Sequence, residues 1–376
     1  MQPVTAPGPS PADPSSAGHS TDSTGRQKAR GRWIWLLSGI VTVAVLTVLS
    51  LVTFVRGTHS YPDQAIVVLP ARTVTITAPV RALNVSSYGA PVEVTRNAGG
   101  RGPVRVTETV TFDAGGNAPS VTTADSGGLL TLAAPACANS DCSVEFMVTV
   151  PSGVAVTAAS DGGNVWVSGT GAAGIDSGGG QVYAAGVGGR LTVSTEGGDM
   201  NVSGVTGGAD LNSGGGQVTA DAVSGPLQVQ SGGGNITAAG APTANLDSGG
   251  GQVYASGIAG SLAVTAEGGG IQADGIGGAV EADTGGGPLS ATGLDSALVT
   301  VTTEGGDVTL GFTRAPQSVQ IDTGGGNGTV TVPGGPYAVT TDSGGAPDQV
   351  TVPVSPAAAR SIRISTEGGF LQVSSV

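Results

Sequence analysis

From residue 157 to the C-terminus, short runs of alternating apolar and polar residues follow one another, and glycine clusters separate them. The stretch from Ile175 to Val205, IDSGGGQVYAAGVGGRLTVSTEGGDMNVSGV, holds two of these clusters. Alternation with a period of two residues is typical of β-strands with one buried face. The first glycines of the clusters are Gly162, Gly178, Gly197, Gly214, Gly232, Gly249, Gly268, Gly285, Gly305, Gly324, Gly344 and Gly368. This recurrence about every 18 residues predicts a solenoid of stacked repeats.

Each repeat carries three apolar steps, which in one repeat are Val182, Val187 and the pair Leu191–Val193. Three strands of five or six residues, at about 3.3 Å per residue, close one turn of about 18 residues. We therefore expect an all-β fold, a three-sided parallel β-helix with rungs of about 18 residues. Eleven or twelve rungs about 4.8 Å apart would give a rod of about 55 Å.

The repeats alternate in kind, because corners such as Asp176-Ser177 alternate with corners such as Thr195-Glu196. The pattern therefore also has a period of about 36 residues. A turn of 36 residues would stack Glu267 directly against Glu304, at a cost of about 0.9 kcal/mol even in water. Turns of 18 residues separate these two carboxylates by two rungs, about 9.6 Å, which is beyond the Debye length. Charge repulsion thus favours the shorter turn.

The N-terminal part of the chain has a different pattern. The 23 residues of Trp33–Val55 contain no charge and are long enough to span a bilayer as a helix. Four basic residues (Arg26, Lys28, Arg30 and Arg32) precede the segment, which predicts a cytoplasmic N-terminus and an exported C-terminal part. A cleaved signal peptide is the alternative, although no A-x-A-like site follows.

The remaining boundaries follow from composition. Residues 1–32, rich in Pro, Ser, Thr and Gly, are expected to be a disordered cytoplasmic tail. Residues 56–64 form a linker, residues 65–156 an N-terminal β region with alternating strands, and residues 157–376 the β-helix repeats. From residue 57 onward the chain has nine Arg, no Lys and 25 Asp or Glu. A nucleic-acid partner is therefore not expected, because binding to phosphates needs clustered positive charge.

Two cysteines, Cys137 and Cys142, lie close together in the exported region, where a disulfide between them is the default expectation. We expect no metal there, because two sulfurs are too few ligands and neither His19 nor His59 is close in sequence.

The sequence contains motifs that partly match catalytic or nucleotide-binding patterns. GTGAAG at Gly169–Gly174 has the spacing of a dinucleotide fingerprint, but another turn follows where a helix is required. The repeats contain no histidine, and their carboxylates recur at regular corners rather than at one irregular spot. We therefore predict a non-enzymatic protein without a cofactor.

The corner residues allow two interpretations. Asp and Ser before glycine form side-chain-to-backbone turn bonds, and glycine supplies positive φ angles. Calcium bound by the acidic corners is the alternative. Tyr183 and Tyr254 share one phase of the repeat and should point outward on one face, either as isolated surface residues or as a thin carbohydrate platform. Trp166 is expected to pack at the first rungs.

The run VEFMVTVPSGVAVTAASDGGNVWVSG (144–169) and the following GGDMNVSGVTG-type repeats resemble the putative-adhesin β-strand-repeat family of bacterial envelope proteins. The resemblance covers residues 65–376. It implies a right-handed β-helix with an adhesive or envelope role, and it supplies no catalytic residues.

The sequence therefore predicts a single-pass cell-membrane protein, anchored by Trp33–Val55, that displays an acidic β-helix outside the cell as an adhesin-like protein or envelope scaffold. An envelope protein or polysaccharide is the expected partner. The alternatives are an envelope-stress or signalling accessory that acts through the anchor and tail, and a calcium-dependent surface binder.

Overall fold

A computed structural model describes residues 65–136 and 142–376, and these residues form two stacked β-sheets. One sheet has 17 strands and is called sheet A here, and the other has 15 strands and is called sheet B. The predicted tail, membrane-spanning segment and linker lie outside the described residues. Within the described ranges there is no α-helix, and no helix there is long and apolar enough to cross a membrane.

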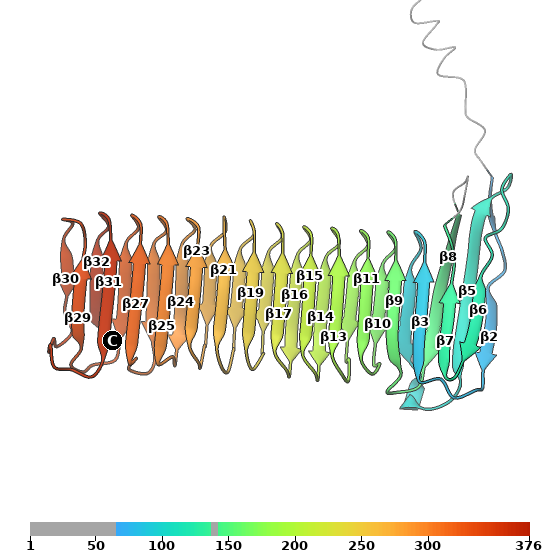
Figure 1. Cartoon of the computed structure of the whole chain (residues 1–376), viewed down its shortest axis with the longest axis horizontal. Coiled ribbons are helices and arrows are strands. Elements are labelled where there is room, and N and C mark those ends of the chain that lie inside the picture. The colour runs from blue at the N-terminus through green and yellow to red at the C-terminus, as the bar shows by residue number, and fades with distance from the viewer. Residues whose placement is uncertain (1–64, 137–141) are drawn as a thin grey trace, which may run out of the picture. The chain divides into compact units, whose positions relative to one another are not determined.

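In the repeat region each turn of the chain contributes one strand to sheet B and the next strand to sheet A (Figure 1). The sheet B strands are β9 Ala155–Ser160, β11 Ala173–Ser177, β13 Leu191–Thr195, β15 Ala209–Ser213, β17 Leu227–Ser231, β19 Ala244–Ser248, β21 Leu262–Ala266, β23 Val280–Thr284, β25 Leu298–Thr303 and β27 Ser318–Thr323. The sheet A strands are β10 Val165–Ser168, β12 Val182–Ala185, β14 Met200–Val205, β16 Val218–Val223, β18 Ile236–Ala239, β20 Val253–Ser256, β22 Ile271–Asp274, β24 Leu289–Leu294, β26 Val308–Phe312 and β28 Gly328–Val332.

The register of these strands confirms the 18-residue rung. Val182 pairs with Met200 and Met200 pairs with Val218, always in parallel. Each of the twelve glycine clusters lies at the end of one sheet B strand, so each cluster marks one rung. Glu267 and Glu304 follow β21 and β25, and β23 lies between those strands. The two glutamates are therefore two rungs apart, as charge repulsion predicts.

The prediction of three strands per turn was wrong. The second apolar step lies in a short corner segment between a sheet A strand and the next sheet B strand, where one buried residue such as Val187 points inward. A glycine with positive φ, Gly186 at 61°, turns the chain just before it. Too few residues remain for a third strand, although rung-to-rung bonds such as Thr206 N to Val187 O continue along the corner. The right-handed sense of the coil stays a prediction.

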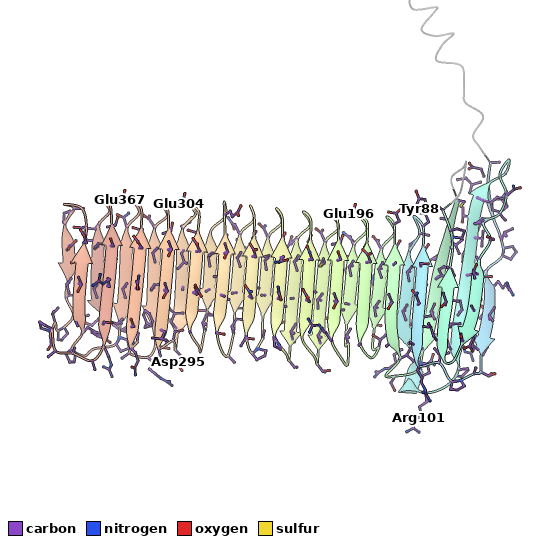
Figure 2. The ribbon with its side chains drawn as sticks, viewed as in Figure 1. Tyr88, Arg101, Glu196, Asp295, Glu304 and Glu367 are labelled. Atoms are coloured by element: carbon purple, nitrogen blue, oxygen red, sulfur yellow. The ribbon has the colours of Figure 1, made fainter. Side chains whose placement is uncertain are left out.

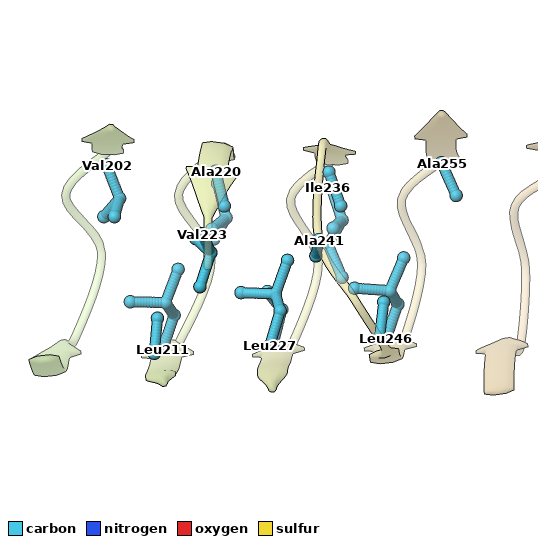
Figure 3. Packing of buried hydrophobic residues seen from close by; sticks show 14 of the residues in the cluster. Val202, Leu211, Ala220, Val223, Leu227, Ile236, Ala241, Leu246 and Ala255 are labelled. Atoms are coloured by element: carbon cyan, nitrogen blue, oxygen red, sulfur yellow. The ribbon is translucent and has the colours of Figure 1, made fainter. Parts of the chain in front are cut away.

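Apolar side chains fill the space between the sheets, and the predicted inward residues Val182, Leu191 and Val193 are among them. Leu211, Leu227 and Leu246 of sheet B face Val202, Ala220 and Ile236 of sheet A, and all six are buried (Figure 3). Val223 at the end of β16 and Ala241 in the corner after β18 close the third side of this core. Because every rung repeats the same inward positions, the core is one continuous column of aliphatic side chains, as expected for a solenoid.

At the N-terminal end the stacking order differs from the chain order. The strands there are β1 Ile66–Val68, β2 Arg72–Ile76, β3 Ala82–Ser87, β4 Val92–Arg96, β5 Val104–Asp113, β6 Thr122–Ser126, β7 Leu129–Ala133 and β8 Cys142–Val150, with a 3-10 turn at Ala98–Gly100. β3 and β4 already form a rung, and β9 and β10 stack directly on it. The chain between them leaves the stack, and β7 and β8 pair with the other side of that rung. Antiparallel strands complete this end, because β6 pairs with β7, β5 with β8, and both β1 and β2 with β5.

The C-terminal end is interleaved in a similar way. Its strands are β29 Ala338–Asp342, β30 Asp348–Val350, β31 Ser361–Thr366 and β32 Leu371–Ser375. β31 pairs with both β27 and β29, and β32 pairs with both β28 and β30. The last two strands of the chain thus lie inside the stack, and the rung formed by β29 and β30 covers them (Figure 1).

Candidate ligand-binding face

The outer face of sheet A carries one continuous column of side chains. In-register parallel pairing places Glu93, Trp166, Tyr183 and Asn201 next to one another on β4, β10, β12 and β14. The rings of Trp166 and Tyr183 are stacked, with centroids 5.2 Å apart and planes 4° from parallel. Trp166 is 37% exposed, so it stands on the surface rather than packing into the first rungs. Stacked aromatic pairs of this kind are held in place by favourable ring–ring contact.

Tyr254 occupies the same column, as its phase predicted. Asn201, Thr219 and Thr237 separate it from Tyr183, so the two tyrosines are four rungs, or about 19 Å, apart. The Tyr183 hydroxyl donates to Gln181 Oε1 at 2.9 Å, and the Tyr254 hydroxyl donates to Gln252 Oε1. Both rings are therefore held in the same way by a glutamine that precedes their own strand.

Shallow hollows lie beside these aromatic residues. One of about 270 Å³ lies against Trp166 and Tyr183. Its other lining residues are Glu93, Thr95, Val167, Ser168 and Ala185. A second hollow of about 220 Å³ lies against Tyr254, where Ser256, Gln272, Asp274 and Thr292 are among the lining residues. Each hollow thus combines an aromatic ring, hydroxyl side chains and one carboxylate, namely Glu93 or Asp274.

A third hollow, of about 190 Å³, opens on the other side of the column. Tyr183 and Thr219 line it together with Asn201, Asp199 and Gln217. Tyr183 therefore borders two hollows, one on each side of its column.

The outer face of sheet B has a different chemistry. Its strands from β9 to β27 contain no aromatic residue but six acidic ones, whereas the sheet A strands from β10 to β28 contain only Asp221 and Asp274. The six are Asp176, Asp210, Asp247, Glu281, Asp283 and Asp322. In the column that begins at Asp176, the next rung carries Ser194 and the one after it Asn212. No two carboxylates of that column lie in adjacent rungs.

The glycine corners between sheet B and sheet A are held by buried hydroxyl groups. The Gly216 amide donates to Ser213 Oγ at 2.9 Å, and Ser213 Oγ donates to the Gly216 carbonyl at 3.2 Å. Ser177, Thr195 and Ser248 make equivalent bonds in their own corners. The interpretation of the corner serines as turn residues is thus confirmed, and Thr195 acts in the same way. The preceding aspartates, such as Asp176, lie on the exposed face of sheet B instead.

The prediction that the cluster glycines supply positive φ angles was wrong for most of them. The positive angles occur mainly at the opposite corner, for example 61° at Gly186 and 62° at Gly204. In the clusters the decisive constraint is space. A Cβ on Gly180 would stand 2.1 Å from the Gly163 carbonyl oxygen of the neighbouring rung.

The 36-residue alternation also has a structural basis in hydrogen bonds. Asn164 Oδ1 accepts a bond from the Gln181 amide of the next rung at 2.9 Å, and Asp199 Oδ1 accepts from the Gln217 amide at 2.9 Å. An Asn or Asp in one kind of rung therefore binds the backbone of the glutamine in the other kind. The same glutamine type then holds Tyr183 and Tyr254 through its side chain.

The acidic corner residues are spread along the stack. Figure 2 shows Glu196, Glu304 and Glu367 along one edge and Asp295 along the opposite edge. Among residues 65–136 and 142–376, no three His, Cys, Asp or Glu side chains lie close enough together to hold a metal ion. The GTGAAG segment forms a corner at Gly169, with φ of 65°, and strand β11 begins within it at Ala173, where a dinucleotide site needs the start of a helix.

The predicted disulfide falls at the edge of the described part. Cys142 begins β8 and is disulfide-bonded, while Cys137 lies outside the described residues. The pairing of Cys137 with Cys142 stays a prediction.

Sequence reasoning missed Glu93 and Thr95 as members of the aromatic face. The only signal was the strand-like alternation of PVEVTR, which gave no partner for that strand. The 58 residues from 97 to 154 separate β4 from β9 in the chain, so the pairing of Glu93 with Trp166 interrupts the 18-residue period.

Comparison with known proteins gives low similarities. No protein-family model matches the chain, and no curated protein is similar to it. A solved structure described as a putative adhesin from Parabacteroides merdae is 14% identical with a TM-score of 0.36, over 67% of this chain and 98% of that one. One from Bacteroides fragilis, also described as a putative adhesin, is 13% identical with a TM-score of 0.24, over 84% of this chain and 99% of that one. A cell adhesion protein from Clostridium sporogenes, also described as putative, is 8% identical with a TM-score of 0.19, over 82% of this chain and 99% of that one. Similarities at this level establish neither a family nor a function for this chain.

Proposed function

We propose that this chain is a non-enzymatic, adhesin-like protein of the bacterial cell envelope that binds its partner with the outer face of sheet A. The observation that carries the proposal is the difference between the two faces. Sheet A presents the stacked Trp166 and Tyr183, Tyr254 and few charges, whereas sheet B presents acidic residues without aromatic ones. Exposed aromatic rings are enriched where proteins bind partners, and a regular acidic face favours solubility.

The proposal includes a place in the cell. Trp33–Val55 anchors the chain in the membrane with the N-terminus in the cytoplasm, and the solenoid stands outside. A stack of rungs suits display, because it holds the outward columns of side chains at fixed spacing. No step in this role needs a catalytic group.

An adhesion assay with two sets of variants tests the proposal. Beads coated with the full-length chain in mild detergent are mixed with purified cell-envelope fragments, and bound fragments are counted. We expect Trp166→Ser with Tyr183→Ser to abolish most of the binding, and Asp210→Asn with Asp247→Asn on sheet B to leave it unchanged. Equal binding by both double variants, with melting temperatures preserved, would overturn the proposal.

A further inference from the structure

We infer that the aromatic column of sheet A binds a linear, uncharged polysaccharide that lies along the rod and contacts Tyr183 and Tyr254 together. This inference rests on the proposed function and names the class of ligand. It follows from the repeat of one local arrangement, from the side chains available in each copy and from the charge around them.

The same local arrangement occurs at two places on sheet A. Tyr183 and Tyr254 lie in one column, each is held by a glutamine two residues before it, and each borders a hollow on the sheet surface. The two copies are about 19 Å apart along the rod. A small compact ligand needs only one such place, whereas a polymer with its own repeat can occupy both at once. Simultaneous contact raises the overall affinity well above that of either place alone.

The hollows combine aromatic rings with hydroxyl and amide groups. The face of an aromatic ring is electron-rich and attracts the polarised C–H groups of a sugar ring. Around the rings, Thr95, Ser168, Ser256 and Thr292 present hydroxyl groups, and Asn201 and Gln272 present amides. These groups both donate and accept hydrogen bonds, which matches a ligand that is covered with hydroxyl groups.

The charged side chains that line the hollows are all acidic. Glu93, Asp199 and Asp274 lie at the hollows, and no Lys or Arg lines any of the three. An anionic polymer would bring its charges next to these carboxylates without a compensating cation, which is unfavourable. A carboxylate accepts bonds from neutral sugar hydroxyls without that cost. The surface therefore favours uncharged polysaccharides over uronic-acid polymers and nucleic acids.

The aromatic rings are also held in position before any ligand binds. Tyr183 is stacked on Trp166 and bonded to Gln181, so little side-chain freedom is lost when a ligand binds. Residues on strands of a rigid stack hold such geometry better than residues on loops.

The test is a titration of the full-length chain, kept in a detergent without a sugar headgroup. The probes are soluble galactomannan, mixed-linkage β-glucan and α-mannan, with polygalacturonate as the charged control. We expect at least one neutral polymer to bind and polygalacturonate not to bind. Tyr183→Ala and Tyr254→Ala should each weaken that binding by about fivefold to tenfold, and the double variant by more than either. Tyr88→Ala, an exposed tyrosine at the turn between β3 and β4, is the matched control and should change nothing (Figure 2).

The length of the probe sharpens the test. An oligosaccharide too short to span about 19 Å should bind to each place independently, so each single variant should halve the stoichiometry instead of lowering a shared affinity. The inference is overturned if polygalacturonate binds as well as the neutral polymers, or if the tyrosine variants keep full affinity. If no polysaccharide binds while envelope fragments still adhere through sheet A, the ligand assignment fails and the proposed function stands. If the fragments do not adhere either, both fail.

Discussion

The carbonyl oxygen of Gly163 lies 2.1 Å from the place where a Cβ on Gly180 would stand, in the next rung of the solenoid. The same relationship recurs along the stack, for example 2.2 Å between Gly216 and the Gly198 carbonyl, and 2.2 Å between Gly251 and the Gly234 carbonyl. The third position of the cluster is therefore glycine because neighbouring rungs approach too closely for a side chain.

This contact predicts an asymmetric effect of two adjacent substitutions. Gly180→Ala should lower the free energy of unfolding by about 3 kcal/mol, because the two backbones can separate only by breaking rung-to-rung bonds. Gly179→Ala is the control, since a Cβ there meets nothing within 4 Å and its φ is not positive. Urea unfolding of the full-length chain measures both, and equal effects would contradict the explanation.

The buried hydroxyl at the corner predicts that one substitution lowers stability and another raises it. Ser213→Ala should lower the free energy of unfolding by about 1–3 kcal/mol, because it leaves the Gly216 amide without its side-chain partner in a buried turn. Ala266 occupies the equivalent position at the end of β21, where no hydroxyl is present. Ala266→Ser should add about 1 kcal/mol by forming the missing turn bonds. Thermal melting of the two variants checks this, and destabilisation by Ala266→Ser would contradict it.

Ala222 is the only residue other than glycine with a positive φ, 54°, among the described residues. Seven equivalent corners along the stack have glycine instead, including Gly204 in the preceding rung, with φ of 62°, and Gly240 in the following one, with φ of 64°. Relief of this strain should make Ala222→Gly more stable by about 0.5–1 kcal/mol, even after the larger loss of chain entropy. Gly204→Ala should shift stability in the opposite direction. The pair is compared by urea unfolding, and a loss of stability in Ala222→Gly would refute the strain.

Tyr337 makes the stability of the folded chain depend on pH in the alkaline range. Its side chain is buried and its hydroxyl donates to the Pro333 carbonyl at 2.7 Å. Burial raises the pKa of Tyr337 above its usual 10.0, and Arg360 partly opposes this. The folded state therefore holds this proton more tightly than the unfolded state. The resulting stability is complete below about pH 10 and is lost as the pH rises through the raised pKa.

An ultraviolet titration of phenolate absorbance should accordingly show one late tyrosine. Tyr337→Phe should remove that late step. A late step that persists in Tyr337→Phe would assign it to another tyrosine.

Much of the fold was predictable because it depends on local pattern. The alternation of Val and Leu with polar residues, and the glycine clusters, predicted the strands, the inward residues and the 18-residue rung. The number of sheets was not predictable in this way, since a buried Val187 in a corner has the same sequence signature as one in a strand. Strand order at the two ends depends on pairings between distant segments, such as β4 with β10 and β28 with β32, and the local pattern does not specify them.

The candidate site was predictable only in part. The shared phase of Tyr183 and Tyr254 followed from the repeat, and the structure places both in one column. The stacking of Trp166 on Tyr183 depends on a 17-residue step between two rungs, and the contribution of Glu93 depends on the insertion between β4 and β9. Those contacts required the three-dimensional structure.

The central claim is that the outer face of sheet A binds the partner, and the fluorescence of Trp166 tests it most directly. Trp33 and Trp35 are the other tryptophans in the chain, so Trp33→Phe with Trp35→Phe leaves Trp166 as the single emitter. Envelope fragments or a bound polysaccharide are added to this full-length variant while binding is followed independently. The account predicts that Trp166 emission shifts to shorter wavelength in proportion to binding, because the ligand removes water from its exposed side. Saturable binding with no change in Trp166 emission would contradict the account.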